Sequence, residues 1–137
     1  MSTHLEEKLE KILEILDRLA KESAKGTPIV VEGTNDVSAL RQLSITGKII
    51  PAKASGKNFI DMIDEVVNTG KREIILLMDF DRRGKEWAKR MTQHLQELKI
   101  KPNMYFWKRF LKLVGRGVKD IEGLATYLET LKKKVYL

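Results

Sequence analysis

The chain has no cysteine in its 137 residues, and no stretch is apolar for long enough to cross a bilayer. The first absence excludes disulfides and thiolate metal sites, and it makes a reducing cytoplasm the expected compartment. The second argues against a membrane partner. The N-terminus has no basic head followed by an apolar run, so we do not expect a secretory signal. A glycine-rich nucleotide fingerprint is also missing, as are internal repeats and a Ser-His-Asp pattern.

Charge is unevenly balanced, with 26 Lys and Arg against 19 Asp and Glu, a net charge of +7. A chain this basic is a candidate for binding polyanions, because cations that neutralise phosphates supply affinity for any nucleic-acid sequence. The composition fits a surface charged for solubility equally well. The choice between these two depends on where the acidic residues lie.

An amphipathic helix is predicted over residues 4–24, with leucine and isoleucine recurring every three or four positions, and Gly26 and Pro28 ending it. We therefore divide the chain into an N-terminal helix, residues 1–26, and one domain, residues 27–137. The apolar face of the helix could dock on its own domain or could dimerise, and the pattern alone leaves both open.

Beyond this helix, short apolar runs alternate with helical patterns. Strands are predicted at 28–32, 48–52, 73–79 and 104–107, and helices at 36–45, 59–68, 84–98 and from 121 onward. The helix at 59–68 is expected to pack through Phe59, Ile60, Ile63 and Val67. Short, continuously apolar strands separated by helices indicate an α/β fold with a Rossmann-like, four-stranded parallel sheet between helices.

Acidic residues follow two of these strands. Glu32 ends the first strand and Asp36 opens the next helix, while Asp79 and Asp81 end the third. Carboxyl ends of parallel strands meet at one edge of a sheet, where ligands bind. Grouped carboxylates repel one another and persist best around a hard cation. The spacing therefore predicts a Mg²⁺ site, with Mn²⁺ as the alternative ion, although Asp36 could also serve only as a favourable charge at a helix N-terminus.

Together, EGTND at 32–36 and DFDRRG at 79–84 resemble the two motifs of the Toprim domain, over roughly residues 27–130. The whole chain is similar to a small, stand-alone Toprim protein of archaeal type. The resemblance implies that Glu32 is a general acid/base, that Asp79 and Asp81 are metal ligands with catalytic roles, and that Asp36 occupies the second acidic position of the first motif. The small Toprim nucleases, including one that matures a small ribosomal RNA, are the closer functional model, because topoisomerases and primases of this family carry the domain within much larger chains.

Basic residues are expected beside these acids. Those in the loops that follow the second and third strands, together with a glycine-flanked arginine, could hold substrate phosphates: Lys53, Ser55, Lys57, Arg82, Arg83 and Arg116. Asp120 lies in a stretch that resembles a late acidic segment of several Toprim proteins, but it could instead cap the last helix. Trp87 is expected to pack.

The sequence thus predicts a Mg²⁺-dependent phosphodiesterase acting on RNA or DNA, in effect a nuclease. A non-catalytic metal- and nucleic-acid-binding module of a larger processing complex is the alternative. A receiver-type phospho-acceptor, which also carries acids after its first and third strands, is disfavoured. No Ser or Thr closes the predicted fourth strand, and no fifth strand with a lysine follows.

Overall fold

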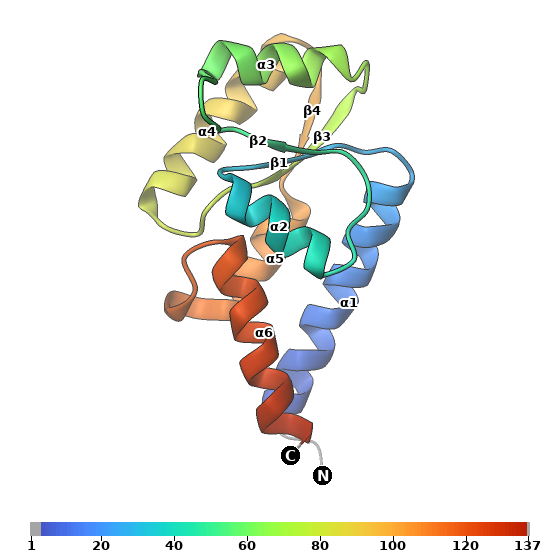
Figure 1. Cartoon of the computed structure of the whole chain (residues 1–137), viewed down its shortest axis with the longest axis vertical. Helices are drawn as coiled ribbons and strands as arrows, with labels where there is room; N and C mark the ends of the chain where they lie inside the picture. Colours follow the sequence, from blue (N-terminus) through green and yellow to red (C-terminus); the bar gives the residue numbers. More distant parts are fainter. Residues whose placement is uncertain (1–3, 137) are drawn as a thin grey trace.

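One parallel sheet organises the chain. The structure, a computed structural model that describes residues 4–136, orders four strands as β2-β1-β3-β4 (Figure 1). The strands are β1 (Ile29–Val31), β2 (Ile49–Pro51), β3 (Glu73–Leu77) and β4 (Lys101–Asn103). The helices are α1 (His4–Ala24), α2 (Thr34–Gln42), α3 (Phe59–Asn68), α4 (Arg82–Glu97), α5 (Tyr105–Val114) and α6 (Ile121–Tyr136), with a 3₁₀ turn η1 at Gly115–Gly117. The predicted α/β class and four-stranded parallel sheet are confirmed.

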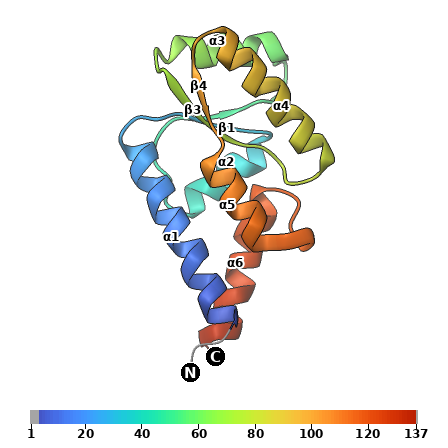
Figure 2. The same cartoon turned by 180° about the vertical axis from the view of Figure 1, so that it is seen from behind.

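Side chains that alternate along the strands divide the core in two. In β1, Val30 packs with α3 and α4, whereas Ile29 and Val31 pack with α1, α2, α5 and α6. Each face of the sheet is therefore covered by helices, as Figure 2 shows from behind. Burial on both faces explains why the strands are continuously apolar in sequence.

Helix α1 docks on its own chain. Ile12 and Leu19 are fully buried, in the same core as residues of α5 and α6. The pictures place α1 beside α5 and α6, with its N-terminal end close to the C-terminal end of α6 (Figures 1 and 2). The apolar face that could have served a dimer is thus used internally. In the part of the chain that is described, no helix has the length and apolar character of a membrane span.

The predicted strand at residues 104–107 is wrong. The fourth strand lies just before it, at Lys101–Asn103, and Tyr105 begins helix α5. The buried residues of α5 are Phe106, Trp107, Phe110 and Val114, which recur at helical spacing. Residues 104–107 are four consecutive apolar residues, which suggested a strand. The helical repeat shows only when Phe110 and Val114, beyond Lys108 and Arg109, are included. Pro102 is tolerated because β4 is an edge strand.

The predicted inner face of α3 is also partly wrong. Met62 and Val66 are buried, whereas Ile60 is 68% exposed and Val67 45% exposed. Phe59 and Ile63 are half-buried at the edge of the core. The helix is apolar on two sides, so periodicity alone could not tell which side faces the sheet.

The strand order reverses direction between β1 and β3, because β2 lies on one side of β1 and β3 on the other. A crevice outside the carboxyl ends of the strands forms at such a point. Glu32 directly follows β1, and Asp79 follows β3 after one further residue, so the topology brings both acids to this crevice.

Candidate metal centre

Glu32 and Lys53 are held side by side by the continuation of the β1–β2 pairing. The backbone N–H of Lys53 donates to the carbonyl of Glu32 at 2.7 Å. The Glu32 side chain is buried, with 7% exposure, and the Lys53 ammonium lies 3.9 Å from its Oε1 atom. A strand-end carboxylate is thus kept out of solvent with one cation beside it.

Asp36 reaches the same crevice from the first turn of α2. Its Oδ2 atom accepts the backbone N–H of Gly33 at 3.1 Å, and its Oδ1 atom accepts the backbone N–H of Glu122 at 3.1 Å. The expectation that Asp36 serves a helix N-terminus therefore holds for two helices, α2 and α6. The side chain is 6% exposed, so these bonds also fix its carboxylate in place.

Asp120 is the last residue of the loop before α6. The backbone N–H of Phe80 donates to the carbonyl of Lys119 at 2.6 Å, which ties this loop to the end of β3. Asp120 caps α6, since its Oδ1 atom accepts the backbone N–H of Gly123 at 2.6 Å. It also belongs to a group with Asp36 and Asp79 in which one carboxylate oxygen from each lies within 4.8 Å of the others. Asp120 therefore caps α6, as the sequence allowed, and its carboxylate also lies in the acidic cluster.

Two oxygens in this crevice are buried without a hydrogen-bond partner among the described residues: Glu32 Oε1 and Asp79 Oδ1. An unpartnered buried polar atom is costly, and a bound cation removes that cost. The donors are all carboxylate oxygens, which suits hard ions such as Mg²⁺ or Mn²⁺ and not a closed zinc site. Asp36, Asp79 and Asp120, with Glu32 beside them, fit a divalent metal on these grounds.

Without a metal the cluster is electrostatically strained. Burial raises the pKa of Asp79 to about 8, assisted by a hydrogen bond with the Glu32 side chain and by the negative charges of Glu32, Asp36 and Asp120. Burial also raises the pKa of Asp36, and the two backbone N–H groups that it accepts oppose that shift. The metal-free site therefore keeps a proton that a cation would displace.

The structure places Asp81 differently. Its Oδ1 atom accepts the backbone N–H of Gly84 at 2.8 Å, so it is the N-cap of α4, and its side chain is exposed. It lies outside the group formed by Asp36, Asp79 and Asp120. Gly84 is buried against the backbone of Asp79, where a Cβ atom would overlap the Asp79 carbonyl.

The predicted phosphate-binding residues differ in their exposure and in how far their side chains are already paired within the protein. Lys57 pairs with Glu65 and donates to the carbonyl of Pro51 at 2.8 Å, so it is committed to packing α3. Arg82 forms an exposed ion pair with Glu86 at 3.6 Å. The others, Ser55, Arg83 and Arg116, are exposed, and Arg116 lies in η1.

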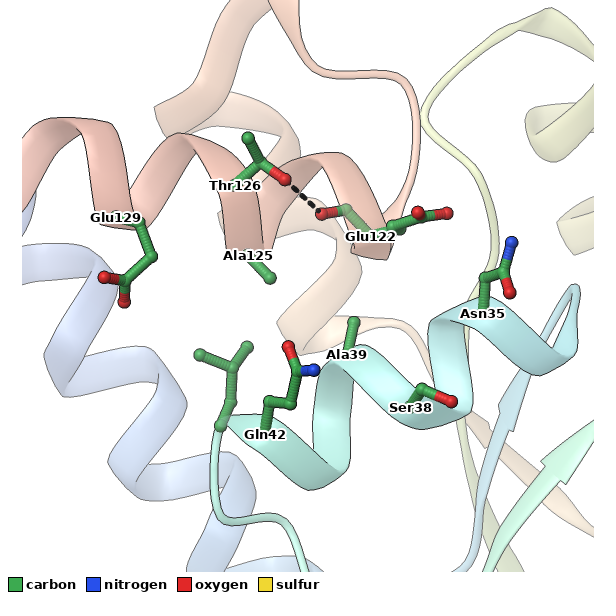
Figure 3. Close-up of a pocket in the computed structure, with 9 residues that line it drawn as sticks. Asn35, Ser38, Ala39, Gln42, Glu122, Ala125, Thr126 and Glu129 are labelled. Carbon is green, nitrogen blue, oxygen red and sulfur yellow. Dashed lines mark hydrogen bonds between the residues drawn. The ribbon is translucent and has the colours of Figure 1, made fainter.

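The acids line a hollow of about 330 Å³ that also includes Thr34, Asn35 and Lys53. A second hollow of about 360 Å³ adjoins it between α2 and α6 and shares Asn35 and Glu122 with it. Figure 3 shows this lining, with Ser38 and Gln42 on α2, and Glu129 and Thr126 on α6. This second hollow has no lysine or arginine in its lining.

Comparisons with known proteins agree with the motifs. Residues 27–108 match the model of the Toprim domain. A UPF0292 protein of Methanocaldococcus jannaschii is 37% identical over 124 residues, which are 90% of this chain and 94% of that relative. A UPF0292 protein of Methanosarcina barkeri is 31% identical over 127 residues, 93% of this chain and 87% of the relative. A solved structure of a protein from Aquifex aeolicus matches with a TM-score of 0.65 and 31% identity, over 80% of this chain and 94% of the other.

Proposed function

This chain belongs to the Toprim family, and on that premise we propose that it is a divalent-metal-dependent phosphodiesterase that cleaves nucleic acid. Family membership and the acidic cluster support a metal-binding, nucleic-acid-related role. One observation carries the proposal further. Three carboxylates from three separate segments converge within 4.8 Å, next to a buried glutamate whose Oε1 atom has no hydrogen-bond partner.

In this proposal Asp36, Asp79 and Asp120 hold Mg²⁺, or Mn²⁺ in its place. The bound ion supplies charge stabilisation at the scissile phosphate. Asp36 is oriented by its bonds to Gly33 and Glu122, and Asp120 by its cap on α6, so both carboxylates are held in place within the cluster. Asp81 is the alternative ligand that the motif suggests.

Glu32 is the proposed general acid/base. Its Oε1 atom accepts no hydrogen bond in the described structure, so it is free to take a proton from an attacking water or to return one to the leaving oxygen. Lys53 is 45% exposed and lies at the mouth of the same hollow, where its ammonium could hold a substrate phosphate. The basic net charge of +7 supports a polyanionic substrate.

A second candidate is a module that binds metal and nucleic acid without cleaving it. The position of Asp81 favours this reading, because its exposed side chain caps α4 outside the acidic cluster, which leaves the cluster without one of the two catalytic aspartates that the motif implies. This module would keep the ion that Asp36, Asp79 and Asp120 suit.

The test is a cleavage assay on end-labelled structured RNA, single-stranded DNA and duplex DNA, with Mg²⁺, Mn²⁺ or EDTA. Glu32→Gln and Asp79→Asn should each remove product, because one deletes the acid/base and the other a metal ligand. Asp64→Asn, an exposed carboxylate on α3, is the matched control and should cleave normally. Binding without product under any ion would favour the module, and full activity of Glu32→Gln would refute its assigned role.

A further inference from the structure

A stripe of cationic and aromatic residues runs along one flank of α4. Its members recur at helical spacing, i, i+4, i+7 and i+11, and are Arg83, Trp87, Arg90 and His94. The buried face of the same helix, formed by Ala88, Met91 and Leu95, is a different one. The stripe starts in the turn after Asp81, next to the acidic crevice, and leads away from it along the helix.

Two residues from the chain after β2 pack on this stripe. The ammonium of Lys53 lies 5.4 Å from the centre of the Trp87 ring. The ring of Phe59 lies 5.5 Å from that of Trp87 and 4.8 Å from that of His94, and the guanidinium of Arg90 lies over Phe59 at 4.0 Å. Contacts thus run from Lys53, at the acidic hollow, through the rings of Trp87 and Phe59 to Arg90 and His94 on α4. We call this surface the α4 platform, and it consists of six residues: Lys53, Phe59, Arg83, Trp87, Arg90 and His94.

Packing of α3 on α4 accounts for the ring contacts but not for the charges. Arg83 and Arg90 have no carboxylate partner among residues 4–136, whereas Arg82 on the same helix pairs with Glu86. Lys53 is the member that touches the acidic hollow, through its 3.9 Å approach to Glu32. The platform is therefore positively charged, half-exposed and continuous with the candidate metal centre.

We propose that the α4 platform binds a single strand of nucleic acid and feeds it to the metal centre, an inference that rests on the proposed function and specifies its substrate. Rings interleaved with cations suit single strands, since any base can stack on an aromatic face and the cations follow the phosphates. A base that stacks on Trp87 takes the place of the Lys53 ammonium, which is then free to pair with the adjacent phosphate. Bases inside a duplex are already stacked and offer no free face.

The experiment measures binding in EDTA, so that it does not depend on cleavage. Single-stranded RNA, single-stranded DNA and duplex DNA of equal length are titrated into the protein, with affinity and tryptophan fluorescence recorded. We expect single strands to quench Trp87 and to bind more tightly than the duplex. Trp87→Leu should weaken single-strand binding about 5- to 100-fold, whereas Trp87→Phe should retain most of the affinity but lose the quench.

Two charge variants complete the design. Arg90→Gln should lower the slope of log affinity against log salt by about 1, as one lost phosphate contact does. Lys89→Gln removes an equal charge from α4 outside the platform and should change affinity by less than about twofold. Circular dichroism of each variant guards against a folding defect in Trp87→Leu.

Equal affinity for duplex and single strands would overturn the proposal, and so would equal effects of Arg90→Gln and Lys89→Gln. These outcomes are separate from failure of the proposed function. Platform-dependent binding without any cleavage would refute only the phosphodiesterase, whereas cleavage that is indifferent to Trp87→Leu and Arg90→Gln would refute only the platform.

Discussion

Asp36 joins the start of α2 to the start of α6 through its bond to the backbone N–H of Glu122, at 3.1 Å and 86 residues apart in sequence. This bond holds the N-terminus of α6, and with it Asp120, against the strand ends that carry Glu32 and Asp79. A residue in the first acidic motif thus organises the part of the site that lies furthest along the chain. The same carboxylate is therefore both a structural anchor and a proposed metal ligand.

Replacing Asp36 with alanine should destabilise the metal-free protein. Two backbone N–H groups, those of Gly33 and Glu122, would lose a partly buried acceptor. We expect the free energy of unfolding to fall by about 1–3 kcal/mol, less whatever is regained by relieving repulsion in the cluster. Urea unfolding measures this, and Asp64→Ala, exposed on α3, should stay within about 0.5 kcal/mol of the wild type. Equal stability of both variants would contradict the anchoring role.

Stability should depend on pH through Asp79. Folding raises its pKa from 3.8 to about 8, so between these values the folded, metal-free protein binds more protons than the unfolded chain. The contribution of this group is full below about pH 4 and is lost as the pH rises through about 8. In EDTA, the melting temperature of Asp79→Asn minus that of the wild type should therefore increase as the pH is raised from 5 to 8.5. A constant difference across that range would refute the raised pKa.

Asp120 and Asp81 can be compared directly, because both are N-caps and asparagine preserves a cap. Asp120→Asn should weaken binding of Mn²⁺ or Mg²⁺ at least about tenfold, since it removes one charge from the cluster, as measured by calorimetry. Asp81→Asn should leave that affinity within about twofold if its exposed side chain stays on α4. The opposite result would favour the ligand set suggested by the motif.

Gly84→Ala should displace the backbone of Asp79 and so distort the acidic cluster. A Cβ atom there would overlap the backbone of Asp79, which cannot yield as a side chain could. We expect a loss of about 1–3 kcal/mol in unfolding free energy, as for other overpacked positions, and weaker metal binding. Gly117→Ala, where nothing lies within 4 Å of the added carbon, is the control and should be nearly neutral. Thermal melts with and without Mg²⁺ measure both effects.

Helix α1 should be required for a stable fold. Ile12 is fully buried in the core that α1 shares with α5 and α6, so Ile12→Ala should cost about 2–5 kcal/mol. Leu5, on the same helix but 40% exposed, should tolerate alanine with little loss. Chemical unfolding distinguishes the two. Sedimentation should show a monomer, and a dimer that dissociates on Leu5→Ala would instead indicate that α1 also self-associates.

The order of elements could be predicted from sequence because it depends on local patterns. Short, continuously apolar runs such as Ile74–Leu77 indicate strands buried on both faces, and their alternation with helices leaves few topologies. Prediction was wrong where a segment fits two patterns. The Tyr105–Trp107 run reads equally as strand or helix over three residues, and α3 offers two apolar faces.

The sequence by itself determined that acids follow β1 and β3 and must therefore meet at one sheet edge, since parallel strands all end there. It also determined the family, through the two motifs. Only the tertiary structure decided the membership of the cluster. A backbone hydrogen bond from Phe80 to Lys119 brings Asp120 in, and the cap on α4 keeps Asp81 at the surface. The bond between Phe80 and Lys119 joins distant segments and depends on how the helices pack, so no local pattern encodes it, whereas the Asp81 cap joins residues only three apart.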